Sequence, residues 1–436
     1  MGDVVRWLIF AAEIIIVFVV ALYVSANRRP SSAIAWILVF ILLPVLGIVA
    51  FLLVGVGRLP RSRRAKQREV SDAIMARTDR SHDVEDREDW PRWLPATVRM
   101  NRALGALPMI GGNQVELIED YDGSIKEMAA AVDTATSYVH VEFFILITDD
   151  TTEPLFAALE RARRRGVSVQ VLVDHVSNLM YPNRRATGRR FAEMGAELRL
   201  MLPLRPFRKE WQRPDLRNHR KLLVVDGAVG FTGSMNLIAE HYHKKKALRR
   251  GLHWDEVMIR ITGPAVSELD AVFLTDWYSE TDHWPEFSTE TVGSAPGADV
   301  DAQVVPSGPS FDNDNNLKLF GSLISSAQRR VLVTSPYYVP EESIQMAMIV
   351  AAHRGIDVEL FVSEVSDQVM VYHAQRSYYE QLLRAGVRIY LYRAPTILHA
   401  KHLLIDDDVC VIGTSNLDVR SLSLHMELSV LIRDIG

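Results

Sequence analysis

The sequence predicts an α/β protein: two duplicated α/β sandwich halves that form one active site, preceded by an N-terminal transmembrane helical hairpin. Three observations predict this fold. An eight-residue pattern occurs twice, a similar order of strands and helices surrounds both copies, and two apolar segments open the chain. A chain of 436 residues is long enough for two domains, or for one domain made of two halves.

The two apolar segments span residues 4–24 and 33–56. The second contains no charged residue, and at about 1.5 Å of rise per residue it can cross a hydrocarbon core of about 30 Å. Pro44 is placed to kink it, which membrane helices tolerate. The first segment contains Arg6 and Glu13, but the second follows at once. We therefore predict a helical hairpin over residues 1–58 rather than a cleaved signal peptide.

Basic residues predict the orientation of this hairpin. Arg28 and Arg29 lie in its short loop, whereas six basic residues follow the second segment: Arg58, Arg61, Arg63, Arg64, Lys66 and Arg68. The positive-inside rule then predicts a multi-pass protein of the inner or plasma membrane, with its catalytic part on the cytoplasmic side. Residues 59–110 are predicted to be a basic and charged linker, whose Trp90 and Trp93 lie either at the membrane interface or on the soluble part.

From about residue 111 the chain alternates strands with helices, and the order repeats. The first half, residues 111–285, is predicted to contain strand 138–145, helix 154–165, strand 167–173, helix 189–194 and strand 197–201. After a linker at 286–300, the second half, residues 301–436, is predicted to contain helix 315–327, strand 331–334, helix 343–353, strand 356–362, helix 373–384 and strand 387–392. The first half continues into a helix at 266–278, whereas the second stops after strand 428–432, which predicts a shorter or C-terminally truncated second half.

The repeated pattern is H-x-K-x-x-x-x-D. Its first copy carries His219, Lys221 and Asp226, and its second carries His399, Lys401 and Asp406. Each Asp is followed seven residues later by a turn of small residues that ends in Asn, and these turns are Gly233-Ser234-Met235-Asn236 and Gly413-Thr414-Ser415-Asn416. A single copy is common in strands that have no catalytic role. Two copies on a duplicated framework predict an active site.

These residue types suit a phosphodiester substrate without a metal or another cofactor. Residues i and i+2 of a strand share a face, so His219 and Lys221 project together, as do His399 and Lys401. Two ammonium groups and the amides of Asn236 and Asn416 can neutralise charge that develops on phosphate. One imidazole can attack phosphorus to form a covalent intermediate, and the other can serve as general acid and base.

The catalytic imidazoles need an acceptor on their other nitrogen, and Asp255 and Glu427 are the candidates, acting across the interface between halves. Asp226 and Asp406 complete the predicted catalytic set. Their alternative role, which we favour, is to lock the ends of the strands. The small-residue turns allow close approach to an anionic group, so Ser234 and Ser415 are predicted to bind substrate.

Other features limit the function. The single Cys410 and the absence of metal-ligand spacing argue against a zinc site. A formal net charge of −5 and the membrane hairpin argue against nucleic acid as a partner. Basic residues near the first motif either keep the protein soluble or bind anionic lipid headgroups. Those predicted to bind substrate are Arg205, Arg208 and Lys209.

With these residues in view, the chain resembles the phospholipase D superfamily, and within it the bacterial cardiolipin synthases of that type. The resemblance covers nearly the whole chain. Beyond the paired motifs, it rests on residues 27–36, 306–309, 334–340, 373–379 and 416–421, which read NRRPSSAIAW, PSGP, TSPYYVP, HAQRSYY and NLDVRS. Residues 233–246 look most like the actinobacterial branch.

The resemblance implies transfer of a phosphatidyl group between two phosphatidylglycerol molecules, giving cardiolipin and glycerol through a phosphohistidine. By analogy with the superfamily, His219 would be the nucleophile and His399 the acid and base. A phospholipase D that hydrolyses phospholipids would use the same residues. A nucleic-acid phosphodiesterase and a non-catalytic membrane scaffold are further alternatives. The oligomeric state is left open, a homo-oligomer included.

Overall fold

The computed structural model describes residues 7, 14–24, 30–51, 55, 59–75, 81–205, 210–211, 213–288, 292–311 and 314–434. The chain divides into two compact units. The first comprises Met1–Arg58 together with Arg213–Asp215, and the second comprises Leu59–Gln212 and Leu216–Gly436.

The described part of the N-terminal segment is helical. Residues 14–24 are helical and are followed by α2 (Pro30–Leu42) and α3 (Pro44–Ala50). Leu43 interrupts the second predicted span at φ −140° and ψ 69°, because proline drives the residue before it out of the helical conformation. In this described part, no single helix combines the length and the apolar content that crossing a membrane requires. Arg6, Glu13, Arg28, Arg29 and Arg58 lie outside the described residues.

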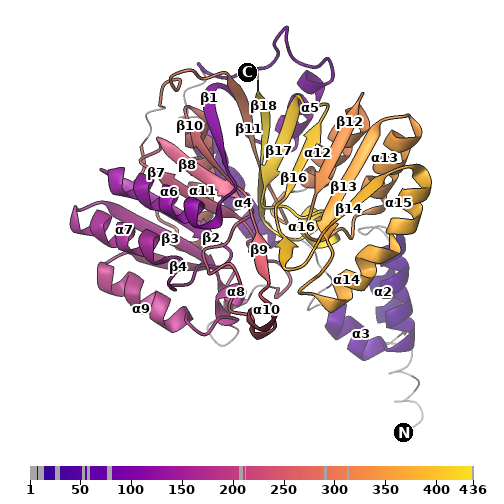
Figure 1. Cartoon of the computed structure of the whole chain (residues 1–436). Helices are drawn as coiled ribbons and strands as arrows, with labels where there is room; N and C mark the ends of the chain where they lie inside the picture. Colours follow the sequence, from indigo (N-terminus) through magenta and orange to yellow (C-terminus); the bar gives the residue numbers. More distant parts are fainter. Residues whose placement is uncertain are drawn as a thin grey trace. The chain divides into compact units, whose positions relative to one another are not determined.

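The second unit is organised around a 14-stranded sheet in which the internal duplication is visible (Figure 1). The first half contributes β4-β3-β2-β7-β8-β10-β1 and the second contributes β14-β13-β12-β16-β17-β18-β11, in matching order from the edge to the centre. The first seven strands are β1 (Met109–Ile118), β2 (Tyr138–Phe143), β3 (Ser168–Asp174), β4 (Glu197–Met201), β7 (Lys221–Val225), β8 (Val229–Gly233) and β10 (Met258–Thr262). The others are β11 (Val300–Ser307), β12 (Arg330–Thr334), β13 (Asp357–Ser363), β14 (Arg388–Tyr392), β16 (His402–Ile405), β17 (Val409–Gly413) and β18 (Glu427–Asp434).

The two halves join where β1 pairs antiparallel with β11, so the predicted pair of sandwiches shares one continuous sheet. Within each half the outer strands are parallel, as in β2 with β3 and β12 with β13. Parallel neighbours need a crossover, and the predicted helices supply it. The motif strands β7 and β16 pair antiparallel with β2 and β12, which places each motif at the inner side of a parallel set.

Helices pack against both halves of the sheet (Figure 1). The first half has α6 (Tyr121–Thr134), α7 (Glu153–Arg164), α8 (His175–Leu179), α9 (Arg184–Met194), α10 (Lys245–Arg250) and α11 (Ala265–Thr281). The second has α12 (Asn315–Ser326), α13 (Glu342–His353), α14 (Val369–Ser377), α15 (Tyr379–Ala385) and α16 (Val419–Ser423). Helix α7 shows why they form: an apolar stripe is buried, Glu153 lies in the first turn, and arginines occupy the last turn.

Several predicted elements differ in the structure. Residues 59–110, predicted to be a linker, contain α4 (Arg61–Met75) and α5 (Leu94–Ala103). Trp90 packs in the core of the second half with 5% of its surface exposed, and its Nε1 donates to Asp301 Oδ2 at 2.9 Å, so it lies on the soluble part. The helix predicted at 373–384 is divided between α14 and α15 at Tyr378.

Candidate active site

Each motif histidine is fixed by backbone from the opposite half. His219 lies two residues before β7, and its N–H donates to the carbonyl of Met426 at 2.8 Å. His399 directly follows β15 (Thr396–Leu398), which pairs in parallel with β9 (His253–Asp255), and its N–H donates to the carbonyl of Asp255 at 2.7 Å. Each half therefore holds the backbone of the motif histidine that belongs to the other half.

The carboxylate that holds each imidazole likewise comes from the opposite half. Glu427 of the second half places Oε2 2.9 Å from Nδ1 of His219. Glu256 of the first half places Oε1 2.6 Å from Nδ1 of His399. With Nδ1 held on each ring, Nε2 is the nitrogen left for chemistry.

This arrangement corrects the predicted role of Asp255. The side chain that reaches His399 belongs to Glu256, whereas Asp255 offers His399 only its backbone carbonyl. The reason is the alternation of side chains along an extended segment: Trp254 and Glu256 are buried on one side, and Asp255 faces the other and is half-exposed.

The small-residue turns hold these carboxylates. Ser234 Oγ donates to Glu256 Oε2 at 2.6 Å, and Thr414 Oγ1 donates to Glu427 Oε2 at 2.5 Å. Ser234 was predicted to bind substrate, but its one hydroxyl hydrogen is committed to Glu256. Gly233 precedes it because an added Cβ would lie 2.3 Å from the carbonyl oxygen of Val257.

Lys221 and Lys401 are buried beside the histidines. Lys221 Nζ donates to the carbonyl of His219 at 2.6 Å, and Lys401 Nζ lies 3.1 Å from Nδ1 of His399. Burial lowers the pKa of Lys221 to about 7 and that of Lys401 to about 8, because water no longer solvates the ammonium groups. The carboxylates of Glu256 and Glu427 oppose this shift for both lysines.

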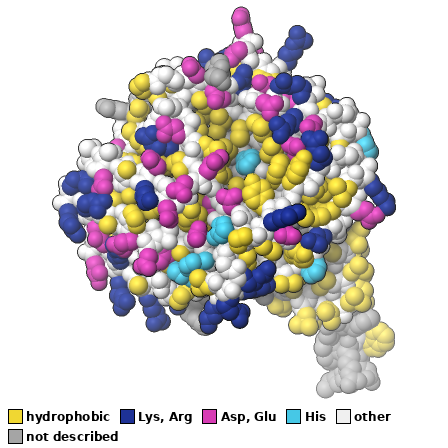
Figure 2. Space-filling model, in the orientation of Figure 1, with side chains coloured by type: hydrophobic (Ala, Val, Ile, Leu, Met, Phe, Trp, Pro, Cys, Tyr) yellow, Lys and Arg dark blue, Asp and Glu magenta, His cyan; other side chains and the backbone are white. Residues whose placement is uncertain are grey.

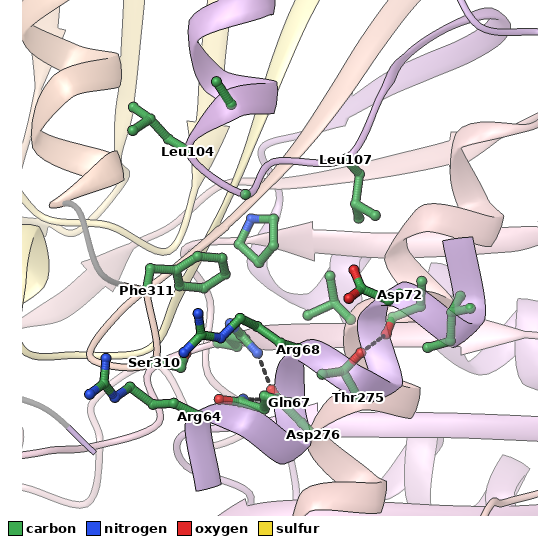
Figure 3. A pocket seen from close by; sticks show the side chains of 17 residues that line it. Arg64, Gln67, Arg68, Asp72, Leu104, Leu107, Thr275, Asp276, Ser310 and Phe311 are labelled. Atoms are coloured by element: carbon green, nitrogen blue, oxygen red, sulfur yellow. Dashed lines mark hydrogen bonds and ion pairs between the residues drawn. The ribbon is translucent and has the colours of Figure 1, made fainter. Parts of the chain in front are cut away.

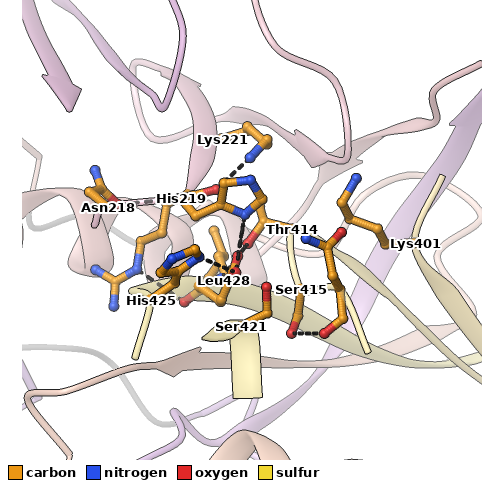
Figure 4. A network of polar contacts seen from close by, with 12 residues as sticks. Asn218, His219, Lys221, Lys401, Thr414, Ser415, Ser421, His425 and Leu428 are labelled. Atoms are coloured by element: carbon orange, nitrogen blue, oxygen red, sulfur yellow. Dashed lines mark hydrogen bonds and ion pairs between the residues drawn. The ribbon is translucent and has the colours of Figure 1, made fainter. Parts of the chain in front are cut away.

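All four motif groups act on one another electrostatically. Burial lowers the pKa of His219 well below its usual value, and the charges of Lys221, Lys401 and His399 lower it further. Burial also lowers the pKa of His399, although Glu256 opposes the shift. Figure 4 shows His219 between Lys221 and Thr414, with Lys401 nearby. The structure thus brings together the two imidazoles and two ammonium groups of the predicted site.

The two predicted asparagines have different surroundings. Asn236 donates through Nδ2 to the hydroxyl of Tyr242 at 3.0 Å, and its Oδ1 accepts from the N–H of Ile145, so its amide is committed to the protein. In the described residues, the buried Oδ1 of Asn416 has no hydrogen-bond partner. Ser415 Oγ accepts from Asn316 Nδ2 at 2.6 Å.

Asp226 and Asp406 were included in the predicted catalytic set, and the structure corrects this. The carboxylate of Asp226 accepts from the backbone N–H groups of Thr136, Ser137 and Tyr138 at 2.7–2.9 Å. Asp406 holds the N–H groups of residues 328–330 in the same way. Both carboxylates therefore fix the start of the neighbouring strand, which is the structural alternative that the sequence favoured.

Of the three predicted basic substrate-binding residues, the structure describes only Arg205. Arg205 belongs to β5 (Leu204–Arg205), which pairs with β6 (Glu210–Trp211) in a separate two-stranded ribbon. Arg208 and Lys209 lie outside the described residues.

Sequence reasoning missed three residues of the site. Glu256 could have been found, because it directly precedes an apolar strand just as Glu427 does. The hydroxyl of Tyr242 donates to Glu256 Oε1 at 2.6 Å, and no sequence pattern indicates that Tyr242 belongs to the site. His425 stacks obliquely near His219 with ring centroids 5.7 Å apart, and neither ring nitrogen has a hydrogen-bond partner in the described residues.

One group in the described part of the chain has the chemistry to hold a metal: His219, His425 and Glu427, whose ligand atoms lie within 4.8 Å of one another. Two imidazoles and a carboxylate fit zinc. An ion bound at Nδ1 of His219 would replace the hydrogen bond between that nitrogen and Glu427. Burial lowers the pKa of His425 to about 3, which keeps its imidazole neutral.

The family described as "Cardiolipin synthase, PLD-like domain" matches residues 128–277 and 321–435, and "Phospholipase_D-nuclease N-terminal" matches residues 14–55. The sequence is 30% identical over 442 residues to cardiolipin synthase A of Pectobacterium carotovorum subsp. carotovorum (strain PC1), covering 99% of this chain and 90% of that protein. It is 31% identical over 424 residues to the cardiolipin synthase of Geobacillus kaustophilus (strain HTA426), covering 96% of this chain and 82% of that protein.

Among solved structures, the phosphatidylserine synthase of Haemophilus influenzae Rd KW20 has a similar fold. The TM-score is 0.55 at 15% identity, and the match covers 78% of this chain and 87% of that chain.

Proposed function

The chain belongs to the cardiolipin synthase family of the phospholipase D superfamily, and from this premise we propose that it transfers a phosphatidyl group from one phosphatidylglycerol to another, releasing glycerol. One observation carries the proposal. Two imidazoles, each held at Nδ1 by a glutamate of the opposite half, share a buried site with two lysines. This arrangement suits a two-step displacement at phosphorus.

In the first step, Nε2 of His219 attacks phosphorus and the bond from phosphorus to the glycerol oxygen breaks. His399, protonated and stabilised by Glu256, gives its proton to the departing oxygen. Glycerol leaves, and the phosphatidyl group is bound to His219. The assignment of His219 as nucleophile follows the superfamily analogy.

In the second step, neutral His399 takes the proton of a hydroxyl group on a second phosphatidylglycerol. That oxygen attacks phosphorus and the bond from nitrogen to phosphorus breaks, which restores His219 and forms cardiolipin. Lys221 and Lys401, in their ammonium forms, neutralise the phosphoryl oxygens in both steps. Asn416 can donate to the same oxygens through its amide nitrogen.

We also propose that residues 1–58 anchor the protein in a membrane as a helical hairpin, with the catalytic part on the cytoplasmic side. Large apolar side chains cover the surface of the described helices: Leu42 is 75% exposed, Leu46 66% and Ile15 62%. Figure 2 shows hydrophobic side chains gathered on this segment. Apolar surfaces of this extent mark contact with lipid or protein. Burial of that surface in lipid would bring the enzyme to phosphatidylglycerol.

The test is turnover of phosphatidylglycerol labelled in its glycerol headgroup, by purified full-length protein in detergent micelles. Cardiolipin and free glycerol in equal amounts are expected, and His219→Ala and His399→Ala should each abolish them. His283→Ala, at an exposed position after α11, is the matched control and should retain activity. Phosphatidic acid as the only lipid product would assign a hydrolase. Unchanged turnover in the two active-site variants would refute the catalytic assignment.

A further inference from the structure

A cavity lies beside Arg220, the residue directly before β7, and its lining includes none of the motif histidines and lysines (Figure 3). It encloses about 300 Å³ between α4, α11 and the loops next to β1 and β11. Arg220 forms part of its wall, because consecutive side chains of an extended segment face opposite sides and Arg220 points away from His219 and Lys221. A volume of this size is at the lower end for small-molecule sites.

One wall of this cavity is basic. Arg64 and Arg68 are four residues apart on α4, so their side chains share one face of the helix. Figure 3 shows both extending toward the loop that carries Ser310 and Phe311. Two neighbouring guanidinium groups provide the planar donors that bind a phosphate.

The interior of the cavity holds unsatisfied polar atoms. Gln67 lies between the two arginines on α4 and is 7% exposed. Its Nε2 donates to Asp276 Oδ1 at 3.2 Å, but its buried Oε1 has no hydrogen-bond partner in the described residues. The buried Oγ of Ser310 has none there either. An amide oxygen can only accept, so it calls for a ligand that brings a hydroxyl or another donor.

The remaining wall is apolar. Leu104, Leu107, Val272 and Phe311 line it. Three guanidinium groups face two carboxylates, those of Asp72 and Asp276, and Asp276 is paired with Arg220. The cavity is therefore amphipathic, with positive charge at one side.

We propose that this cavity binds an anionic phospholipid whose headgroup carries a free hydroxyl, with the phosphate on Arg64 and Arg68, the hydroxyl on Gln67, and part of an acyl chain on the apolar wall. The site does not depend on the proposed transfer reaction. It is linked to the catalytic centre, because Asp276 holds Arg220 and Arg220 Nε donates to the carbonyl of Glu427 at 3.1 Å. The carboxylate of that same Glu427 holds His219.

The test uses full-length protein in neutral detergent and a lysophosphatidylglycerol that carries a photoreactive diazirine in its acyl chain. After irradiation and digestion, mass spectrometry should find adducts within residues 61–75, 104–107 or 306–311, as well as any in the segments that carry the motif histidines. In the Arg64→Gln, Arg68→Gln double variant, labelling of residues 61–75, 104–107 and 306–311 should fall about tenfold. Labelling of the segments that carry the motif histidines serves as an internal reference and should not change.

Arg61→Gln is the matched control, since Arg61 is exposed on α4 and does not line the cavity. Each single variant, Arg64→Gln and Arg68→Gln, should lose part of the labelling, and circular dichroism checks that the helix is retained. Equal labelling by the choline analogue would overturn headgroup recognition. Protection by inorganic phosphate at the same concentration would assign a free-anion site instead of a lipid site. Adducts confined to other segments, or unchanged labelling in the double variant, would also overturn the proposal.

Discussion

Nδ1 of His219 lies 2.9 Å from Oε2 of Glu427, although 208 residues separate them in the sequence. The reciprocal contact joins His399 to Glu256. Neither half of the duplicated sheet therefore contains a complete histidine–glutamate pair of its own. The duplication produces one site because each half supplies the imidazole of one pair and the carboxylate of the other.

Glu256→Gln should lower kcat by about 100-fold, because a neutral amide cannot stabilise the His399 imidazolium that donates the proton. Asp255→Asn is the matched control. It changes the adjacent carboxylate, which does not reach the ring, and should retain most of the activity. The measurement is cardiolipin formation at saturating phosphatidylglycerol, with folding of both variants checked by thermal unfolding. Loss of activity in Asp255→Asn alone would reverse the assignment.

Asp226→Asn should destabilise the protein and leave the kcat of the folded enzyme nearly unchanged. The amide that replaces the carboxylate has one oxygen for three backbone N–H groups. Leaving such donors unsatisfied costs about 1–3 kcal/mol. Urea denaturation measures the loss. Asp407→Asn, in the corresponding turn of the second motif but exposed, should cost little. A fall in kcat without a loss of stability would restore Asp226 to the catalytic set.

The duplicated order of strands was predictable, because each half repeats the same alternation of apolar strands and glycine-terminated helices. The strands that pair across the centre of the sheet, β1 and β11, were not predicted. Their register, Met109 opposite Gln303 and Asn113 opposite Val300, depends on contacts far apart in the sequence. Local patterns carry no information about such partners.

The site was predictable down to the motif residues and Glu427, but not to the partner of His399. Asp255 and Glu256 are adjacent carboxylates, and only the parallel pairing of β9 with β15 decides which of them faces the ring. Asn236 looked like a phosphate donor by its repeat position. The amide nitrogen of Asn236 instead donates to the hydroxyl of Tyr242. The repeat does not indicate Tyr242, because among the described residues the second half shows no equivalent contact at Asn416.

The lowered lysine pKa values predict an alkaline limit to activity. Lys221, with a pKa of about 7, and Lys401, with a pKa of about 8, bind phosphate as cations, and His399, whose pKa burial lowers, must be protonated in the first step. The value of kcat/KM should therefore fall as pH rises and these groups lose their protons. The pKa of His219 is lowered well below its usual value, so its neutral, nucleophilic form persists on the acid side. Bound phosphate favours the ammonium forms, which should move the limit in kcat to higher pH than that in kcat/KM.

This profile is measured with a soluble short-chain phosphatidylglycerol at constant ionic strength. Thermal unfolding at the extremes of pH separates titration from loss of fold. An alkaline limit near 10.4, the pKa of an ordinary solvated lysine, would show that burial does not control these groups.

Chelation of divalent metals should leave the rate unchanged. The ammonium groups of Lys221 and Lys401 supply the positive charge, and Glu427 already occupies Nδ1 of His219. The measurement compares turnover before and after dialysis against EDTA. The contrary result would be a loss that zinc restores in the wild type and fails to restore in His425→Asn, which would place an ion on His219, His425 and Glu427.

Tyr242→Phe should shift the acid limb of the rate profile to higher pH. The Tyr242 hydroxyl and Nδ1 of His399 share one carboxylate oxygen, Oε1 of Glu256, each at 2.6 Å. Removing the hydroxyl leaves more of the carboxylate charge for the imidazolium, so the pKa of His399 should rise. As pH falls, His399 would then become protonated earlier and fail as the base of the second step.

Tyr337→Phe is the matched control for this effect. The rings of both tyrosines flank His399 edge-on, with centroids 6.1 Å and 6.2 Å from its imidazole, but the Tyr337 hydroxyl donates to Asp367 instead of Glu256. Its removal should leave the acid limb in place. Equal shifts in the two variants would mean that ring packing, and not the hydrogen bond to Glu256, sets the pKa of His399. A shift in Tyr242→Phe alone would identify Tyr242 as the residue that distinguishes the acid and base histidine from its counterpart, since the bond from Thr414 to Glu427 corresponds to the bond from Ser234 to Glu256 and the Tyr242 bond is additional.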